Sequence, residues 1–194
     1  MLASNSHPPW ALLRSWISAE ESSVLRSEIS KSIFWSQPSI NLFGKNFLVP
    51  RRTAFIGKRG LLYSYSGVTH EAKGWSDWIV PLLVKLNELC FCEFNACLLN
   101  LYKDGNDSMG WHSDDESELN HAQPIASLSL GSTRDFALKH RFEHKKTLLE
   151  LNDGDLLIMY PPCQSEWLHS LPKRRNVNQS RINLTFRCLL TNHQ

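Results

Sequence analysis

The second half of the chain is a series of short alternating segments, and this pattern constrains the fold more than any other feature. Six runs follow Cys92, each bounded by turn signals. Alternation of apolar and polar residues is typical of strands with one buried face. Several short strands after a helix-bearing first half predict helices packed on a β-sandwich or jelly roll. The runs are Phe94–Lys103, Ile125–Leu130, Asp135–Lys139, Thr147–Leu151, Asp155–Tyr160 and Arg181–Leu189.

Two helices are predicted in the first half. An S-x-x-E capping pattern begins at Ser18, and apolar residues then repeat every four positions, so a helix is expected over about 19–33. A second apolar stripe with a period near 3.6 residues covers 75–90. Pro81 lies inside this stripe and suits the first turn of a helix, so the regular helix is expected to begin near Val80. Both helices are interpreted as supports of the core.

The chain is expected to form one globular domain preceded by a short arm. Its 194 residues suffice for a full core, and 42% hydrophobic with 21% charged residues is the balance of a folded protein. Residues 1–17, which contain Pro8-Pro9 and two tryptophans, are predicted to be an extended arm that lies on the domain. We therefore expect a single domain over residues 18–194.

Cysteine usage and hydropathy indicate an intracellular protein. The five cysteines are odd in number and irregularly spaced, so we interpret them as reduced thiols and not as a disulfide framework. The N-terminus lacks the long apolar run of a signal peptide, and no stretch approaches transmembrane length. We expect a soluble monomer, cytoplasmic in a bacterium or nuclear in a eukaryote, with no membrane association and no obligate protein partner.

Basic residues are grouped, although the net charge is only +2. Basic groups in loops can contact phosphates, although any one of them alone is better explained as a solvated turn. Five groups in one chain favour nucleic acid as a partner. They are Arg51-Arg52, Lys58-Arg59, Lys139-His140-Arg141, His144-Lys145-Lys146 and Lys173-Arg174-Arg175.

A metal site is predicted at Trp111-His112-Ser113-Asp114. His112 and Asp114 are two residues apart in an extended segment, so their side chains lie on the same side. A neutral imidazole and a carboxylate suit a divalent transition metal. Two histidines with one carboxylate are the ligand set of non-haem Fe(II) oxygenases. The third ligand must be a further histidine that the fold brings close.

The residues alone leave the choice of that histidine open. His169 lies near the end of the strand-rich half, and His121, His140 and His144 compete with it. These three lie in polar or basic loops, where a solvated histidine is the usual case. A charged loop also disfavours a buried cationic site, which favours His169.

The segment 181–187 alternates strictly between polar and apolar side chains. An edge strand with one wet face is the ordinary explanation of such a pattern. Two guanidiniums beside an amide and a hydroxyl, however, form a row of donors suited to carboxylates. The residues on the polar face are Arg181, Asn183, Thr185 and Arg187.

A second strand repeats this arrangement. Asn100 and Tyr102 are two residues apart, so their hydrogen-bonding groups also share one strand face. Two strands of this kind predict the lining of a pocket for an acidic small molecule. A dicarboxylate that also chelates the metal would fit it.

In their order and spacing these motifs resemble the AlkB family of nucleic-acid demethylases. The ordered series is far more specific than any one piece. The resemblance implies an α+β, mainly β fold: a double-stranded β-helix (jelly roll) over residues 94–190, with supporting helices and a nucleotide-recognition lid in residues 18–93. The motifs are Asn100-Leu-Tyr102-Lys-Asp-Gly105, Trp111-His112-Ser-Asp114-Asp115-Glu116, Ile125-Ala-Ser127, Arg134-Asp-Phe136, His169-Ser-Leu-Pro172 and Arg181-Ile-Asn-Leu-Thr185-Phe-Arg187.

The resemblance implies an Fe(II)- and 2-oxoglutarate-dependent dioxygenase that consumes O2. His112, Asp114 and His169 would bind Fe(II) and be the catalytic residues. Arg181 would pair with the distal carboxylate of 2-oxoglutarate. The residues expected to hold 2-oxoglutarate are Asn100, Tyr102, Arg181, Asn183, Thr185 and Arg187.

The first half resembles the branch of the family that repairs duplex DNA. In that branch an aromatic finger enters the base stack where the damaged base is flipped out, and Phe43 is at this position. Tyr63 and Tyr65 share a face and, with His112, are predicted to sandwich the flipped base. The branch usually shows phenylalanine where this chain has Tyr65. The motifs are Leu42-Phe43-Gly44-Lys45, Val49-Pro50-Arg51-Arg52 and Tyr63-Ser64-Tyr65-Ser66-Gly67.

Acidic and basic residues complete the expected substrate site. Asp115 and Glu116 are predicted to hydrogen-bond the base edge, and nearby carboxylates favour a cationic base such as 1-methyladenine. The basic group after the third metal ligand is predicted to touch phosphates. The full substrate set is Phe43, Gly44, Lys45, Arg51, Tyr63, Ser64, Tyr65, Asp115, Glu116, Lys173, Arg174 and Arg175.

The function expected from the resemblance is direct repair of alkylated DNA. The N-methyl group of 1-methyladenine or 3-methylcytosine would be hydroxylated and lost as formaldehyde, with succinate and CO2 formed. Three alternatives stay open: methylated RNA as the substrate, nucleic-acid binding without catalysis, and an oxygenase acting on protein side chains. The complete ligand set counts against the second alternative. The aromatic residues and basic loops count against the third.

Overall fold

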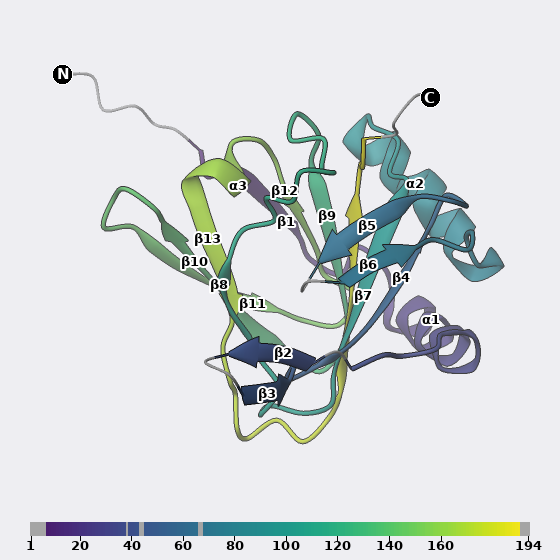
Figure 1. Ribbon diagram of the computed structural model, residues 1–194, viewed down its shortest axis with the longest axis horizontal. Coiled ribbons are helices and arrows are strands. Elements are labelled where there is room, and N and C mark those ends of the chain that lie inside the picture. The colour runs from purple at the N-terminus through teal and green to yellow at the C-terminus, as the bar shows by residue number, and fades with distance from the viewer. Residues whose placement is uncertain (1–6, 38, 43–44, 66–67, 191–194) are drawn as a thin grey trace.

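The computed structural model describes residues 7–37, 39–42, 45–65 and 68–190. Two antiparallel sheets face each other and form a jelly-roll core, with two separate hairpins at one side of it (Figure 1). All strand pairs within both sheets are antiparallel, so each strand places successive side chains on opposite faces.

Most strands are short, and their order alternates between early and late parts of the chain. In the described residues the larger sheet runs β1 (Trp10–Leu13), β12 (Leu156–Met159), β9 (Ile125–Gly131), β14 (Arg181–Arg187), β7 (Ala96–Tyr102) and β4 (Arg52–Gly57). The smaller sheet runs β11 (Lys146–Leu151), β10 (Arg134–His140), β13 (Trp167–Leu171) and β8 (Met109–His112). The hairpins are β2 (Ser39–Leu42) with β3 (Lys45–Leu48) and β5 (Leu62–Tyr65) with β6 (Val68–Glu71). The helices are α1 (Ala19–Ser32), α2 (Val80–Cys90) and α3 (Cys163–Glu166), and a 3-10 turn spans Asp77–Ile79.

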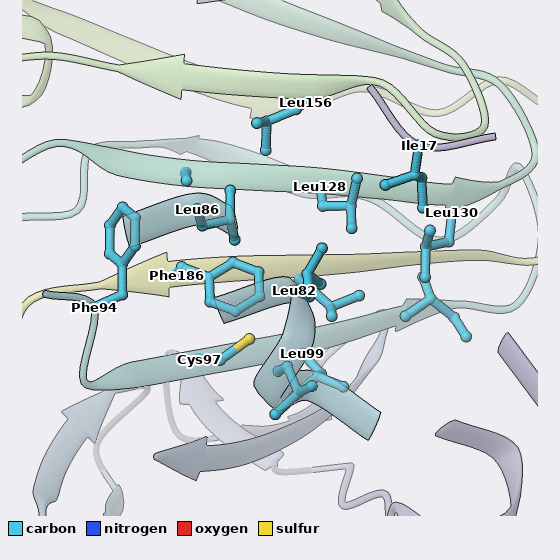
Figure 2. Close-up of a cluster of buried hydrophobic side chains, with 14 of the residues drawn as sticks. Ile17, Leu82, Leu86, Phe94, Cys97, Leu99, Leu128, Leu130, Leu156 and Phe186 are labelled. Carbon is cyan, nitrogen blue, oxygen red and sulfur yellow. The ribbon is translucent and has the colours of Figure 1, made fainter. Parts of the chain in front are cut away.

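The two long helices cover the outer face of the larger sheet (Figure 1). Figure 2 shows Leu82 and Leu86 of α2 against Leu128 and Phe186 of the sheet, all of them buried. Burial of these apolar side chains removes them from water and holds the helices on the sheet. Both predicted helices are thus present, and Pro81 lies in the first turn of α2. Within the described residues, no helix combines the length and the apolar character needed to cross a membrane.

The first helix begins at a complete capping box. The Ser18 Oγ accepts a hydrogen bond from the Glu21 N–H at 3.1 Å, and the Glu21 carboxylate accepts one from the Ser18 N–H at 2.8 Å. Because Ser18→Ala leaves one backbone donor without its partner, it is expected to lower the free energy of unfolding by about 1 kcal/mol. Urea denaturation measures this loss. Ser23→Ala, at an exposed position within α1, is the control and is expected to cause no loss, since alanine is the better helix former. Equal losses in both variants would contradict a capping effect.

The predicted alternation of residues 181–187 places polar side chains inside the jelly roll. Ile182, Leu184 and Phe186 of β14 belong to the cluster that packs under the helices. The intervening polar residues therefore point toward the smaller sheet. Part of the space between the sheets is filled by a second apolar cluster around Phe136 and Leu157. The rest is a polar cavity.

Each of the six predicted runs contains a strand, whereas β8 and β13 were not among them. Two strands of the larger sheet come from the first half of the chain. β1, within the predicted N-terminal arm, pairs with β12, and β4 pairs with β7. The larger sheet thus combines the predicted arm, the predicted lid segment and the predicted core segment.

Candidate active site

Three side chains converge between the two sheets. His112 ends β8, His169 lies in the middle of β13, and the two residues are direct partners in the antiparallel ladder. Asp114 follows β8 by two residues. Its Oδ1 lies 3.7 Å from the His112 Nε2 and 3.8 Å from the His169 Nε2. One ligand atom from each residue lies within 4.8 Å of the other two, so a single metal ion can contact all three.

The charges of these groups suit a divalent cation. Burial alone would raise the pKa of Asp114, but Arg187, with the two histidines, lowers that pKa to about 2. Burial lowers the pKa of His169 to about 3, which keeps its imidazole neutral and able to coordinate a metal. An ionised carboxylate beside neutral imidazole is the donor chemistry that non-haem Fe(II) sites use.

Asp114 divides its two oxygens between two tasks. Oδ1 faces the histidines, whereas Oδ2 accepts hydrogen bonds from the Arg187 Nε at 3.1 Å and Nη2 at 2.6 Å. Both side chains are about 5% exposed. A buried and paired carboxylate keeps one orientation, so Arg187 holds Asp114 with its free oxygen toward the histidines.

The predicted donors from β7 and β14 line one cavity with these three residues. The cavity has a volume of about 240 Å³ and lies between the sheets. Figure 1 shows β14 and β7 on one side of the molecule and β8 and β13 on the other. All the residues predicted to hold 2-oxoglutarate line this cavity: Asn100, Tyr102, Arg181, Asn183, Thr185 and Arg187.

Arg181 is a buried cation with no carboxylate partner among the described residues. It is 2% exposed, its Nη2 donates to the Ser129 Oγ at 2.8 Å, and its Nε has no acceptor. Burial lowers the pKa of Arg181 to about 10. Such a group is costly unless an anion joins it, and a carboxylate is the anion that a guanidinium pairs with best. The cavity therefore fits a molecule with one carboxylate at Arg181.

Four of the other residues predicted to hold 2-oxoglutarate already form hydrogen bonds within the protein. The Asn183 amide donates to the Ser127 Oγ at 2.8 Å, and the Thr185 hydroxyl donates to the Asn183 Oδ1 at 2.8 Å. Arg187 is paired with Asp114. The Asn100 Oδ1 accepts from the Arg51 Nε at 2.8 Å. Their contacts with 2-oxoglutarate stay predictions, and Arg181 has the strongest structural support.

The predicted substrate residues do not all reach this cavity. Glu116 and Arg51 line it, and burial, with Asp114 next to it, raises the pKa of Glu116. Asp115 instead lines a neighbouring cavity of about 380 Å³. Tyr63 is only 1% exposed, and its ring packs 5.4 Å from the Phe55 ring. The predicted stacking of Tyr63 on a base stays a prediction.

Some predicted residues lie elsewhere or outside the described part of the chain. Phe43 and Gly44 are not among the described residues, and the structure gives only the backbone of Lys45 and Tyr65. The Ser64 N–H donates to the Glu118 carboxylate, at the edge of the β5–β6 hairpin. In the basic group after β13, Lys173 and Arg175 are exposed. Arg174 forms ion pairs with Asp135 and Glu150 at 3.6 and 3.3 Å.

Sequence reasoning missed several residues that shape the site. Ser129 holds Arg181. Arg134 belongs to one of the motifs but had no predicted role; it is fully buried and donates to the carbonyls of Asp104, Asp107 and Pro172. Gln164 accepts a hydrogen bond from the Asp114 backbone. The serines of β9 carried a signal, since polar residues two apart in an apolar strand mark a polar face. No sequence signal distinguishes Gln164.

Comparisons with known proteins agree with this geometry. Residues 10–187 match the family model described as the 2OG-Fe(II) oxygenase superfamily. The chain belongs to this superfamily. It is 43% identical over 164 residues to the DNA oxidative demethylase ALKBH2 of Mus musculus, covering 78% of this chain and 66% of that protein. It is 33% identical over 182 residues to the mouse alpha-ketoglutarate-dependent dioxygenase alkB homolog 3, covering 89% of this chain and 63% of that protein.

A solved structure shows the same fold at lower sequence similarity. The structure of OsALKBH1 superimposes with a TM-score of 0.67 at 18% identity and covers 95% of this chain and 100% of that one. The chain spans 57–66% of the length of the four ALKBH2 relatives compared.

Several predictions are thereby confirmed. Membership of the 2OG-Fe(II) oxygenase superfamily confirms the expected enzyme class and its requirement for Fe(II), 2-oxoglutarate and O2. The ALKBH2 and alkB homolog 3 relatives confirm the resemblance to the AlkB family, and OsALKBH1 confirms the jelly roll. The donor set of His112, Asp114 and His169 fits Fe(II), and the unpaired guanidinium of Arg181 fits a carboxylate of 2-oxoglutarate.

Proposed function

We propose that this chain is an oxidative demethylase that removes N-methyl groups from bases such as 1-methyladenine and 3-methylcytosine in DNA. The observation that carries the proposal is the single cavity in which a complete metal triad, an unpaired buried arginine and the Glu116 carboxylate lie together. The similarity to the DNA oxidative demethylase ALKBH2 supports DNA as the substrate.

The residues of the cavity have separate tasks in this reaction. His112, Asp114 and His169 would hold Fe(II), and Arg181 would bind the distal carboxylate of 2-oxoglutarate. Bound here together with O2, Fe(II) and 2-oxoglutarate would supply the chemistry that hydroxylates the N-methyl carbon. The hydroxylated base would then lose formaldehyde. Arg187 keeps the Asp114 carboxylate oriented throughout.

Glu116 is placed to select a cationic base. Its carboxyl group is half-buried in the cavity that the metal triad lines. Burial raises its pKa, and a cation placed next to it would restore the charged form. A base that carries a positive charge because of its N-methyl group would therefore gain both a hydrogen bond and an ion pair.

The first test is mass spectrometry of a duplex oligonucleotide that carries one 1-methyladenine. The oligonucleotide is incubated with the protein, Fe(II), ascorbate and 2-oxoglutarate, beside an Asp114→Ala control. Loss of one methyl mass that requires both Fe(II) and 2-oxoglutarate is the expected result. Loss only on single-stranded DNA or RNA would keep the chemistry and reject duplex DNA. Succinate without loss of methyl on any nucleic acid would reject the substrate.

The Phe43→Ala variant tests whether the enzyme acts on duplex DNA through an aromatic finger. If the Phe43 ring fills the gap left by the flipped base, its stacking offsets part of the unstacking free energy of a few kcal/mol. The Phe43→Ala variant lacks this stacking. We expect activity on the methylated duplex to fall at least about 10-fold, since 1.4 kcal/mol corresponds to a factor of ten. Activity on the same strand without its complement is expected to fall much less. Equal losses on both substrates, measured by the same assay, would reject the finger.

A further inference from the structure

Gln164 connects the metal centre to the segment that precedes the third metal ligand. It lies in the short helix α3, and its Oε1 accepts a hydrogen bond from the backbone N–H of Asp114 at 3.0 Å. Its Nε2 lies 3.5 Å from the Met159 Sδ. Two contacts thus hold the amide in one orientation, with its oxygen toward the metal-binding segment.

The backbone at Asp114 lacks the support that the other ligands receive from the sheet. His112 and His169 lie on paired strands. β8 ends at His112, and residues 113–116 form no ladder. Among the described residues, the Asp114 N–H donates only to the Gln164 Oε1. Because a buried backbone donor needs a partner, this side chain replaces the missing strand pairing.

The two tethers of Asp114 act on different parts of the residue. Arg187 fixes the Oδ2 of the side chain, and Gln164 fixes the main chain. With only the Arg187 contact, the carboxylate could turn about that ion pair and move Oδ1 away from the histidines. Both tethers together define where Oδ1 lies.

The bond also joins two segments that each carry a metal ligand. Gln164 and Asp114 are separated by 50 positions in the sequence. α3 ends at Glu166, and β13, which carries His169, begins at the next residue. The Gln164 contact therefore fixes the His-x-Asp segment relative to the strand of the third ligand.

We propose that Gln164 is a positioning residue of the metal centre, which aligns the Asp114 carboxylate with His112 and His169 through the Asp114 backbone. It does not contact the metal itself. This proposal rests on the metal triad and is independent of the nucleic-acid substrate proposed above. Partners that orient metal ligands in this way typically account for about 10–100-fold in metal affinity.

The chain offers matched variants for a test. Gln164→Met keeps a side chain of similar volume but removes the amide acceptor, so packing changes little. Gln164→Glu keeps an oxygen acceptor for the Asp114 N–H. Gln123→Met makes the same chemical change on the wall of the neighbouring cavity, which Gln123 and Gln164 both line. Among the described residues, the Gln123 side chain forms no hydrogen bond with the metal-binding segment, so this variant serves as the control.

The measurement is the affinity of the full chain for Mn(II), a redox-inactive probe, from the electron paramagnetic resonance signal of the free ion. Neither 2-oxoglutarate nor nucleic acid is present. We expect Gln164→Met to weaken Mn(II) binding about 10–100-fold. Gln164→Glu and Gln123→Met are expected to bind Mn(II) close to the wild-type affinity. Circular dichroism confirms that each variant is folded at the temperature of the titration.

Two results would overturn the proposal. Wild-type affinity in Gln164→Met would show that the Asp114 backbone needs no tether. Affinity as weak in Gln164→Glu as in Gln164→Met would show that the acceptor oxygen is not the group that matters. Because no nucleic acid is used, either result is distinct from a failure of the proposed demethylase function, which leaves Mn(II) binding unchanged.

Discussion

Replacing Asp114 with alanine is expected to abolish Fe(II)-dependent turnover and, separately, to destabilise the metal-free protein by about 3–5 kcal/mol. The first effect follows from the loss of the carboxylate that faces both histidines. Loss of a group that only orients a ligand costs about 10–100-fold, so loss of the ligand itself is expected to exceed about 100-fold. The second effect follows from Arg187, which would remain buried without its carboxylate partner.

His112→Ala separates these two effects. It removes a metal ligand too, but the His112 side chain is half-buried, and its loss leaves Asp114 paired with Arg187. We therefore expect it to lose Fe(II)-dependent succinate formation as fully as Asp114→Ala does. Its metal-free stability is expected to fall much less than that of Asp114→Ala, because no buried charge is left without its partner.

Urea denaturation in the presence of a chelator measures the metal-free stability of both variants. Repeating it with Mn(II) measures metal binding, because a ligand that binds only the native state stabilises it by about 4 kcal/mol at 1,000 times its Kd. The wild type is expected to gain stability with Mn(II), and both variants are expected to gain little. Asp77→Ala, at an exposed position in the 3-10 turn that precedes α2, is the control for loss of an aspartate. Near-native turnover in His112→Ala with added iron would show that the ligand assignment is wrong.

Local sequence patterns predicted the parts of the site that lie on one strand. Strict alternation in residues 181–187 is enough to place Arg181 and Arg187 on one face, because successive side chains of a strand point to opposite sides. The same rule placed His112 and Asp114 together. The apolar face of the same strand, β14, packs under the helices.

Contacts between distant segments were beyond this reasoning. Loop composition favoured His169 over the other histidines but left the choice open, because its proximity to His112 arises from the register between β8 and β13. Arg181 and Arg187 look equivalent in the sequence, yet one pairs with Asp114 and the other has no anion. The difference depends on which end of β14 meets the segment after β8. Gln164 reaches Asp114 from a short helix that no periodicity announces.

Two buried arginines near the Tyr102 ring provide the other prediction of large effect. The Arg181 guanidinium lies 5.5 Å from the Tyr102 ring centroid, and that of Arg134 lies 5.7 Å from it. Arg134 donates to three backbone carbonyls at 2.7–3.0 Å. Arg181 donates to one serine hydroxyl only, and the Nε of each arginine has no acceptor among the described residues. The same substitution is therefore expected to have opposite consequences at the two positions.

Arg181→Met is expected to raise the Kd for 2-oxoglutarate by about 30- to 5,000-fold. Removing one partner of a buried, hydrogen-bonded charge pair costs about 2–5 kcal/mol, and each 1.4 kcal/mol is tenfold. Its metal-free stability is expected to hold or to rise, because an apolar side chain replaces an unpaired buried cation. Arg134→Met is expected to lose about 3–5 kcal/mol of stability, since its carbonyl partners lose charged donors. Its Kd for 2-oxoglutarate is expected to change far less.

Isothermal titration of 2-oxoglutarate into the Mn(II)-loaded variants, with urea denaturation of the metal-free proteins, gives both quantities without turnover. If the role of Arg181 is to bind the cosubstrate, Arg181→Met raises the Kd for 2-oxoglutarate without lowering the free energy of unfolding. Removing a cation that stabilises the fold lowers the free energy of unfolding, as is expected for Arg134→Met. A buried cation that serves to bind an anion destabilises the free protein while it is unpaired. Its removal therefore weakens the binding of 2-oxoglutarate without lowering the free energy of unfolding. If Arg181→Met loses stability and binds 2-oxoglutarate as the wild type does, the buried guanidinium serves the fold and the carboxylate binds elsewhere.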